Sequence, residues 1–362
     1  MSLLIFLTVL SVLVVVHEWG HFITAKSLGV RVEKFSLGFG PKLLSRVHDG
    51  TEFMLCAIPL GGYVKMAGDE RTNCKGEKDE YYAQPPGHRA LIVVMGPVVN
   101  YILAYLCFCV VFIFGYPTLA SKVGEVVSGY PAQISDLKKG DTIIRIDSVN
   151  IQSWEDIQKY IVTSRNEQLN FTILRDGQKI SKVITPRHEV ITNIFGQKEN
   201  IRMVGIKPED EIVVLKFGFV ESIVKAFTNL VEITTTTYKA LYRMATGAMS
   251  PKDTMTGPLG IYDIIKKAAA MGFFYLLYVV GIISASLAIF NLLPFPVLDG
   301  GHIFFLTIEK IRGKNFSPQT DEVVSKIGFS LIICLALFVF YADFERFGWI
   351  DKIKMLWNHF GF

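Results

Sequence analysis

The sequence His17-Glu18-Trp19-Gly20-His21 lies near the end of an apolar run that begins at Met1 and has no earlier charged side chain. On a helix, an HExxH pattern places two imidazoles one turn apart on one face, where both can bind the same zinc ion. The glutamate between them projects beside the metal and can take a proton from the attacking water. Because ionisable side chains are costly inside a bilayer, two histidines and a glutamate there indicate a functional site. The motif therefore predicts a metalloprotease whose site lies within the membrane.

The composition is typical of a membrane protein with one additional domain. Hydrophobic residues make up 51% of the 362 residues and charged residues only 19%, which leaves room for several spans and a domain of ordinary size. The net charge of +4 is modest and no dense basic stretch occurs, so nucleic acid is not an expected partner. The five cysteines are scattered without a CxxC pair. Neither a disulfide framework nor a second metal site is predicted.

Hydropathy predicts four membrane spans. A cleaved signal peptide is the alternative for the first of them. That alternative is disfavoured because the segment lacks a basic beginning and ends in the histidine motif instead of a small-residue cleavage site. The four predicted spans are Leu3–Ala25, Leu91–Tyr116, Ala268–Leu298 and Ile327–Tyr341.

The orientation of these spans follows from the distribution of Lys and Arg. The connection Ser27–Ala90 carries nine basic residues, whereas none precedes the first span. The positive-inside rule places this connection in the cytoplasm, residues 117–267 outside, and the loop 299–326 inside again. From Ser2 to His17, a helix rises roughly 23 Å. The motif is therefore expected just below the cytoplasmic surface, with a polar path that admits water.

A third metal ligand must come from a distant part of the chain, since a catalytic zinc ion usually has three protein ligands and a water. The third predicted span ends in the sequence NLLPFPVLDGGH at 291–302, which offers Asp299 and His302. Both lie at the cytoplasmic end of a span that runs in the same direction as the first. The prolines there should unwind the helix, and Gly300 and Gly301 should allow an unusual backbone path. The pattern favours Asp299 but leaves His302 open.

Three motifs together resemble the site-2 protease family of intramembrane zinc metalloproteases, and within it the bacterial regulator-of-sigma-E protease group. They are HEWGH in the first span, Gly96-Pro97-Val98-Val99-Asn100 in the second and NLLPFPVLDGGH in the third. The resemblance extends from the first span to the fourth. It implies a zinc cofactor and a location in the bacterial cytoplasmic (inner) membrane, with the site near the cytoplasmic side.

The resemblance also assigns roles to individual residues. It implies that His17, His21 and Asp299 are the zinc ligands and that Glu18 is the catalytic acid and base. Asn291 is implied to hold the substrate backbone near the metal. An amide within an uncharged span needs a hydrogen-bond partner, so Asn100 either positions Glu18, contacts substrate or joins two helices. Asn100 is counted with Asn291 as a candidate substrate-binding residue.

Two apolar segments in the first connection, Phe35–Lys42 and Phe53–Val64, are too short to span and are broken by Gly and Pro. They are predicted to be strands with turns. The resemblance implies a re-entrant β loop that can pair with an extended substrate segment. Such pairing would expose scissile amides that a helix hides. The alternative is an ordinary cytoplasmic hairpin.

The segment Val123–Arg187 resembles a PDZ domain. Its pattern predicts strands at Val123–Val127 and 140–147, a helix at Trp154–Thr163, and a hairpin around Asp176-Gly177. PDZ domains bind extended peptides at a sheet edge, so a filter for substrate ectodomains is expected, with a passive spacer as the alternative. Related proteases often carry two tandem PDZ domains, whereas this chain has room for one.

The predicted fold is an α-helical polytopic membrane protein of about four transmembrane helices, with a re-entrant β loop and one inserted PDZ domain. An amphipathic helix is expected from Leu215, Phe219, Ile223, Phe227 and Leu230, and an interfacial helix at the C-terminus. The predicted domains are 1–116 (two spans and the β loop), 117–210 (PDZ domain), 211–267 (amphipathic connecting helices), 268–341 (spans three and four) and 342–362 (interfacial helix).

These features predict a zinc-dependent intramembrane endopeptidase that cleaves the spans of single-span membrane proteins, such as anti-sigma factors or remnant signal peptides. The expected partners are these substrates, the lipid bilayer and an upstream site-1-type protease that trims the same substrate. A catalytically silent adaptor is one alternative, and the intact HExxH and LDG sequences argue against it. A metal transporter is another, but it should carry several acidic residues within its spans, and spans two to four have none before Asp299.

Overall fold

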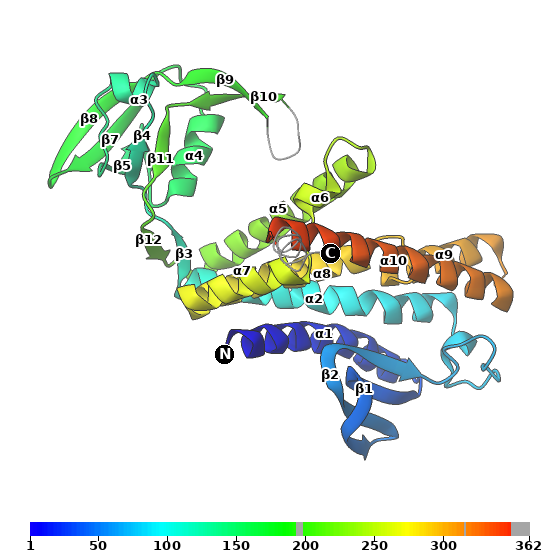
Figure 1. Ribbon diagram of the computed structural model, residues 1–362. Coiled ribbons are helices and arrows are strands. Elements are labelled where there is room, and N and C mark those ends of the chain that lie inside the picture. The colour runs from blue at the N-terminus through cyan, green and yellow to red at the C-terminus, as the bar shows by residue number, and fades with distance from the viewer. Residues whose placement is uncertain (193–197, 315, 349–362) are drawn as a thin grey trace, which may run out of the picture. The chain divides into compact units, whose positions relative to one another are not determined.

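Four helices of the computed structural model are long and apolar enough to cross a membrane (Figure 1): α1 (Ser2–Ser27), α2 (Pro86–Phe114), α8 (Phe273–Asn291) and α10 (Pro318–Arg346). The structure describes residues 1–192, 198–314 and 316–348. The shortest of the four has 19 residues, which at 1.5 Å per residue is about 29 Å and matches the hydrocarbon core of a bilayer. One helix therefore corresponds to each predicted span, and the protein is a multi-pass membrane protein.

Two spans have limits that differ from those predicted. The apolar segment Ala268–Leu298 is divided, because α7 (Pro258–Met271) ends before Gly272 and α8 begins after it. Gly272 has a φ of 112°, which a helix does not allow. Hydropathy continues across this glycine and does not register the break. The fourth helix begins at Pro318, well before the predicted Ile327.

The predicted separate helix at 342–362 is not seen in the part that the structure describes. The helix α10 continues without a break to Arg346, because the sequence between Tyr341 and Arg346 contains neither Gly nor Pro. Gly348, with a φ of 67°, follows the end of the helix. Residues 349–362, the rest of the predicted helix, lie outside the described residues.

The connection between α1 and α2 contains one long antiparallel hairpin of β1 (Val32–His48) and β2 (Thr51–Met66). Asp49 and Gly50 have φ values of 47° and 72° and form the two-residue turn. Positive φ at both central positions matches the right-handed twist of the flanking strands. The two predicted strand segments are thus confirmed, although the strands are longer than expected.

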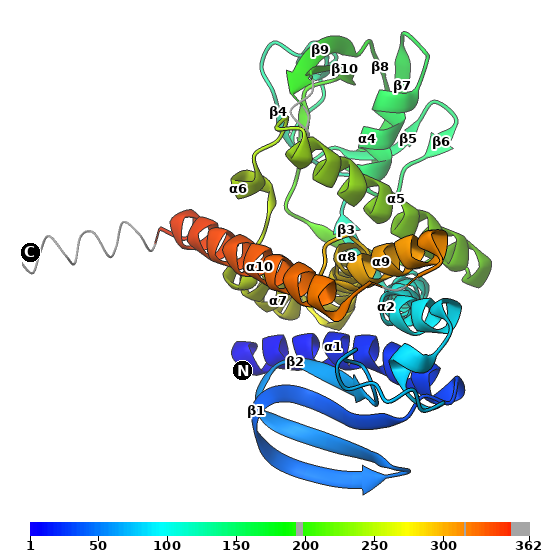
Figure 2. The same cartoon turned by 90° about the vertical axis from the view of Figure 1, so that its right-hand side faces the viewer.

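Irregularities in both strands make this hairpin wider than two strands. Residues 52–55 pair on one side with 44–47 and on the other with 34–37. Residues 32–37 pair in turn with the final segment 62–66. That final segment is the edge that lies beside α1, and the strongly curved ribbon is visible in Figure 2.

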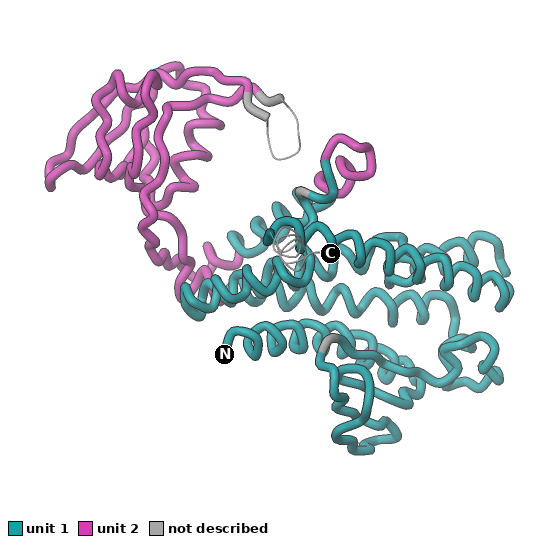
Figure 3. The backbone as a smooth tube through the Cα atoms, in the orientation of Figure 1, with its two compact units in different colours: residues 1–109, 224–238, 250–362 teal, residues 110–223, 239–249 magenta. Residues whose placement is uncertain are grey.

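The chain forms two compact units (Figure 3), one of residues 1–109, 224–238 and 250–362 and the other of residues 110–223 and 239–249. The second unit is built on a four-stranded antiparallel sheet in the order β6-β5-β7-β8. Asp176 and Gly177, both with positive φ, form the turn between β7 and β8, as predicted. The strands of this sheet are β5 (Thr142–Ile146), β6 (Val149–Asn150), β7 (Leu169–Arg175) and β8 (Gln178–Ile184).

The helix α4 (Trp154–Thr163) covers an apolar core in the second unit and has the predicted limits. Its first turn is closed by a capping box in which the Ser153 hydroxyl accepts from the Asp156 N–H and the Asp156 carboxylate accepts from the Ser153 N–H. Ile157 and the sheet residue Phe171 are completely buried in this core.

Three two-stranded ladders complete the second unit. They pair β3 (Tyr116–Leu119) with β12 (Ile212–Leu215), β4 (Val123–Val126) with β11 (Ile206–Pro208), and β9 (Arg187–Thr192) with β10 (Lys198–Met203); α3 is Pro131–Ile134. The first ladder brings together the points where the chain enters and leaves, because the Ala120 N–H donates to the Glu211 carbonyl over 2.8 Å.

The connecting helices differ from the prediction at their start. Leu215 ends strand β12, and α5 (Phe219–Ala245) begins after Gly218, so the helical spacing from Leu215 does not continue into the helix. Phe219 and Phe227 are largely exposed on α5. The remaining short elements are the 3-10 helix η1 (Tyr81–Ala83), α6 (Pro251–Thr254) and α9 (Asp299–Arg312).

A buried carboxylate joins the last helix to α7. Asp343 of α10 is completely buried and accepts hydrogen bonds from the backbone N–H groups of Gly257, Leu259 and Gly260 over 3.0–3.1 Å. These groups begin α7 and have no partner within their own helix. The negative charge also lies at the positive end of the helix dipole. Asp343 therefore fixes the N-terminus of α7 against α10.

We expect Asp343→Ala to lower the free energy of unfolding by about 3 kcal/mol, because three N–H groups would lose their acceptor in a buried place. Thermal and denaturant unfolding in detergent would measure this change. Glu345→Ala is the control, since the Glu345 carboxylate forms an exposed ion pair with Lys252, and the loss of this pair should cost less than about 1 kcal/mol. Equal effects of the two variants would contradict the role of Asp343.

Candidate metal centre

The two histidines of the HExxH motif face each other across one turn of α1. The Nε2 atoms of His17 and His21 are 3.2 Å apart, and their rings meet edge to face. Both side chains are about nine-tenths buried. The uninterrupted helix from Ser2 to Ser27 fixes this arrangement, as the spacing in the sequence predicts.

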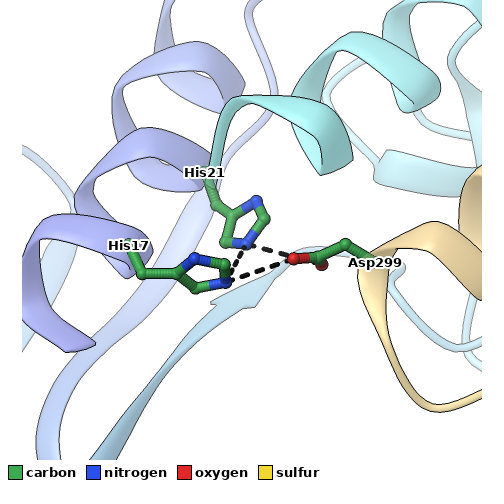
Figure 4. Close-up of side chains that lie close together, drawn as sticks. All are labelled: His17, His21 and Asp299. Carbon is green, nitrogen blue, oxygen red and sulfur yellow. Dashed lines mark hydrogen bonds and ion pairs between the residues drawn. The ribbon is translucent and has the colours of Figure 1, made fainter. Parts of the chain in front are cut away.

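The carboxylate of Asp299 completes a cluster with these imidazoles (Figure 4). Asp299 Oδ2 lies 3.2 Å from His17 Nε2, and Asp299 Oδ1 lies 3.6 Å from His21 Nε2. Two ligand atoms of a tetrahedral zinc ion, each about 2.0–2.1 Å from the metal, are about 3.3 Å apart. The observed separations therefore fit a single zinc ion. His302 does not belong to this group of potential ligands.

The Asp299 carboxylate is poorly satisfied without a cation. Its buried Oδ2 has no hydrogen-bond donor among the described residues. A buried carboxylate that faces two imidazoles is costly unless a positive charge compensates it. The donor set of two imidazoles and a carboxylate, with room for a water, is one that catalytic zinc sites use.

The helix α9 brings Asp299 to the histidines, because Asp299 is its first residue. Residues 292–298 are not helical, so the two prolines end α8 as predicted. Gly300 and Gly301 are helical, contrary to the predicted unusual backbone path. They serve close packing instead: a Cβ atom would lie 2.2 Å from the Leu292 carbonyl oxygen at the first glycine and 2.0 Å from the Phe295 carbonyl oxygen at the second.

The far end of α9 is held by a buried charge cluster. Glu309 is 3% exposed, and its Oε2 atom lies 3.3 Å from a guanidinium nitrogen of Arg89, which lies in the first turn of α2 and is also buried. Arg71 contacts both Glu309 and Asp321 of α10. Nothing in the spacing of the sequence indicated this cluster, since its members come from four separate segments. It links α9 to the chain before α2 and to α10.

Glu18 lines a cavity of about 350 Å³ together with His21, Asp299 and His302. The backbone N–H of Val64, on the edge of the hairpin, interacts with its carboxylate. The edge approaches closely, because a Cβ atom on Gly62 would lie 3.4 Å from Glu18 Cγ. Glu18, the cluster of potential metal ligands and the edge of the hairpin therefore lie close together around one cavity.

Two further residues of this cavity come from the loop before α2 and were not anticipated from the sequence. Burial raises the pKa of the Tyr81 hydroxyl. Burial also raises the pKa of the Asp69 carboxyl, although the Met66 N–H donates to it over 3.2 Å. The loop thus lines the cavity with polar groups that can form hydrogen bonds with water.

The two candidate substrate-binding amides both lie next to His17. Asn291, the last residue of α8, places its Nδ2 atom 3.4 Å from His17 Nε2. Asn100 of α2 is completely buried and places its Nδ2 atom 3.3 Å from His17 Nδ1. The two amides therefore contact opposite nitrogens of one imidazole.

The helices α1 and α2 approach each other through glycine. A Cβ atom on Gly20 would lie 2.3 Å from the carbonyl oxygen of Met95. A Cβ atom on Gly96 would lie 2.3 Å from His21 Nε2 and 2.9 Å from His17 Cε1. Small residues permit this kind of close contact between membrane helices.

Comparison with known proteins agrees with this geometry. The model of peptidase family M50 matches residues 5–335. A Campylobacter jejuni protein named "Putative zinc metalloprotease Cj1068" is 35% identical over 93% of this chain and 92% of its own length. A Clostridium acetobutylicum protein, named in the same way, is 33% identical over 94% of this chain and 97% of its own length. Metalloprotease MmpA of Caulobacter vibrioides is 31% identical over 94% of both chains.

The space at Gly96 generates a test of the cluster. We expect Gly96→Ala to displace the imidazoles and weaken zinc binding roughly 10–100-fold, since overpacking costs about 1–3 kcal/mol. A competition titration against a chromophoric chelator would measure the affinity. Gly87→Ala is the matched control, because Gly87 lies in the same helix and a Cβ atom added there would have no neighbour within 4 Å among the described residues. Unchanged affinity in Gly96→Ala would show that the imidazoles do not bind the metal as arranged here.

Proposed function

The chain belongs to peptidase family M50 and is a zinc metalloendopeptidase, and we propose that it cleaves membrane-spanning segments of single-span proteins inside the bilayer. The observation that carries the proposal is the convergence of His17, His21 and Asp299 within one membrane helix and the start of α9. A protease of soluble substrates would have no need to place these groups in an apolar helix, where they are costly.

His17 and His21 would hold the zinc ion through their Nε2 atoms, with Asp299 as the third ligand. Zinc at this position supplies a Lewis acid and lets water ionise near neutral pH. Asp299 would balance part of the positive charge, which would compensate the Oδ2 atom for its missing hydrogen-bond donor. The 3.2 Å and 3.6 Å separations of its oxygens from the imidazoles support this assignment.

Glu18 acts as the general base and then as the general acid. Its carboxylate lines the cavity that also contains Asp299 and His21. From there it takes a proton from the attacking water and delivers it to the leaving amide nitrogen. The Val64 N–H interacts with the carboxylate and supports its orientation.

We propose that the substrate adds to the edge 62–66 of the hairpin as an extended strand. An edge strand offers unpaired N–H and C=O groups, which an unwound substrate backbone can pair with. Because Gly62 approaches Glu18, a substrate strand bound at this edge would lie next to the Glu18 carboxylate. Asn291 then holds the substrate backbone on the other side, since its amide is 3.4 Å from His17 Nε2.

The same hairpin is proposed to be re-entrant, dipping into the membrane from the cytoplasmic side. Leu43, Leu44 and Val47 on its outer strand are more than 60% exposed. Apolar side chains of this kind are stable in lipid, while the pairing within the hairpin satisfies its backbone. Basic residues concentrated between α1 and α2 support a cytoplasmic location for this connection.

The second unit is proposed to be a PDZ domain outside the cytoplasm that filters substrates by their ectodomains. Its sheet, the helix α4 and the groove between α4 and residues 201–206 support this identification. The groove has a volume of about 130 Å³ and is mostly apolar. We further propose a bacterial inner-membrane location and an upstream site-1-type protease that trims substrates such as anti-sigma factors or remnant signal peptides.

The catalytic assignment predicts that Glu18→Gln lowers the turnover of a short model span roughly 10²–10⁴-fold, as expected for the loss of a general acid and base. Cleavage would be followed in detergent by mass spectrometry. A zinc chelator should abolish cleavage by the wild type, and added zinc should restore it. Glu18→Gln protein that binds zinc normally and still cleaves at the wild-type rate would refute the role of Glu18.

The filter predicts a difference between two substrates. Because Ala120 and Glu211 are hydrogen-bonded to each other, residues 121–210 can be replaced by a short glycine linker that leaves the ladder of β3 and β12 in place. This variant should cleave a substrate with a full ectodomain faster than the wild type does, and a trimmed substrate at the same rate. Loss of cleavage of the trimmed substrate would show that the domain is structural.

A further inference from the structure

The segment Gly96-Pro97-Val98-Val99-Asn100 of α2 is not used by the catalytic scheme above, yet it lies against the metal-binding histidines. Asn100 is the most informative member. Its side chain is completely buried in the uncharged segment 91–116, and its Nδ2 atom is 3.3 Å from His17 Nδ1. Its Oδ1 atom has no hydrogen-bond partner among the described residues. An amide oxygen with no donor in such a place is costly.

The chemistry of the neighbouring imidazole resolves this cost. If His17 binds zinc through Nε2, its proton resides on Nδ1, which is then a donor. An Asn NH₂ group that faces this N–H would place two donors against each other. The oxygen and nitrogen of an amide have almost the same shape, so a half-turn of the side-chain amide exchanges their places. Asn100 Oδ1 then accepts from His17 Nδ1, and both groups are satisfied.

His21 provides an independent example of the same arrangement. Its Nδ1 atom is 2.9 Å from the carbonyl oxygen of Ile92, which can only accept a hydrogen bond. The proton of His21 therefore lies on Nδ1, and Nε2 is free to face the metal. Ile92 and Asn100 both belong to α2. One helix thus supplies the acceptors for both imidazoles.

The other members of the segment make room for these contacts and hold them. Gly96 lets the two rings pack directly on the backbone of α2, where a Cβ atom would collide with His21 Nε2. Pro97 is the single proline inside α2, and it removes the N–H that would otherwise bond the carbonyl one helical turn before it. Ser284 of α8 donates to the carbonyl oxygen of Asn100 over 2.8 Å and is itself fully buried.

We propose that this segment of α2 orients the zinc ligands and that Asn100 is a positioning residue, which holds His17 in the tautomer with its proton on Nδ1. The inference rests on the metal site proposed above. No substrate contact is proposed for Asn100, because its side chain is completely buried and faces the ring nitrogen away from the metal. The hydrogen bond also makes the imidazole a stronger ligand, because it stabilises partial positive charge on the ring.

Two variants separate the acceptor from the shape of the side chain. Asn100→Leu keeps the approximate volume and removes the acceptor, so the Kd for zinc should rise roughly 10–100-fold, as is usual when a partner of a metal-binding histidine is lost. Asn100→Asp keeps an acceptor and should bind zinc within about threefold of the wild type. Competition against a chromophoric chelator with the full-length protein in detergent would measure both values, without any need for catalysis.

The matched control is Asn229→Leu, which changes another partly buried amide of the same unit that accepts from Tyr278 and has no contact with the histidines. Its zinc affinity should equal that of the wild type. Should Asn100→Leu fail to fold, the wild type itself still tests the assignment. A ¹⁵N spectrum of the histidine-labelled, zinc-loaded protein should show His17 coordinated through Nε2 and protonated at Nδ1.

Three results would overturn the inference: Asn100→Leu that binds zinc as tightly as the wild type, Asn100→Asp that binds as weakly as Asn100→Leu, or a ¹⁵N spectrum with His17 coordinated through Nδ1. These results are distinct from failure of the metal site itself. In that case the wild type would bind no zinc, and the chelator titration would show this before any variant is made.

Discussion

The two histidine ligands in this apolar helical bundle depend on close contact between α1 and α2. The rings of His17 and His21 pack on the backbone of α2 because Gly96 has no side chain, and Gly20 allows the two helices to approach. This contact gives each imidazole a buried hydrogen-bond partner, and the facing Nε2 atoms are left for a cation. The cost of burying polar groups is thereby met by partners that also fix their direction.

The third ligand, Asp299, is positioned by the short helix α9, which is held by contacts other than those between α1 and α2. Asp299 begins α9, and the glycines after it press against the carbonyl oxygens of residues 292 and 295. The other end of α9 is tied by Glu309 to Arg71 and Arg89. Removing one partner of a buried ion pair lowers the stability of a protein by several kcal/mol. This cluster therefore restrains the helix that carries Asp299. The geometry of the metal site is therefore shared among α1, α2 and α9.

Much of this was predictable from the sequence because strong local signals were involved. The HExxH spacing, the four apolar runs and the turn at Asp176-Gly177 depend on neighbouring residues alone. The limits of α8 and the continuation of α10 to Arg346 were wrong in the prediction, because hydropathy averages over a break at Gly272 and does not show where a helix ends. The contacts of Asn100 and Glu309 involve partners more than 80 and 200 residues away, which spacing cannot reveal.

X-ray absorption at the zinc edge of the wild type, Asp299→Ala and His302→Ala tests the central claim most directly. We expect a four-coordinate wild-type site with nitrogen and oxygen ligands at about 2.0–2.1 Å and no sulfur, which would lie at about 2.3 Å. His302→Ala should leave this spectrum unchanged, and Asp299→Ala should lose an oxygen ligand and most of the bound zinc. A spectrum changed by His302→Ala and not by Asp299→Ala would contradict the site described here.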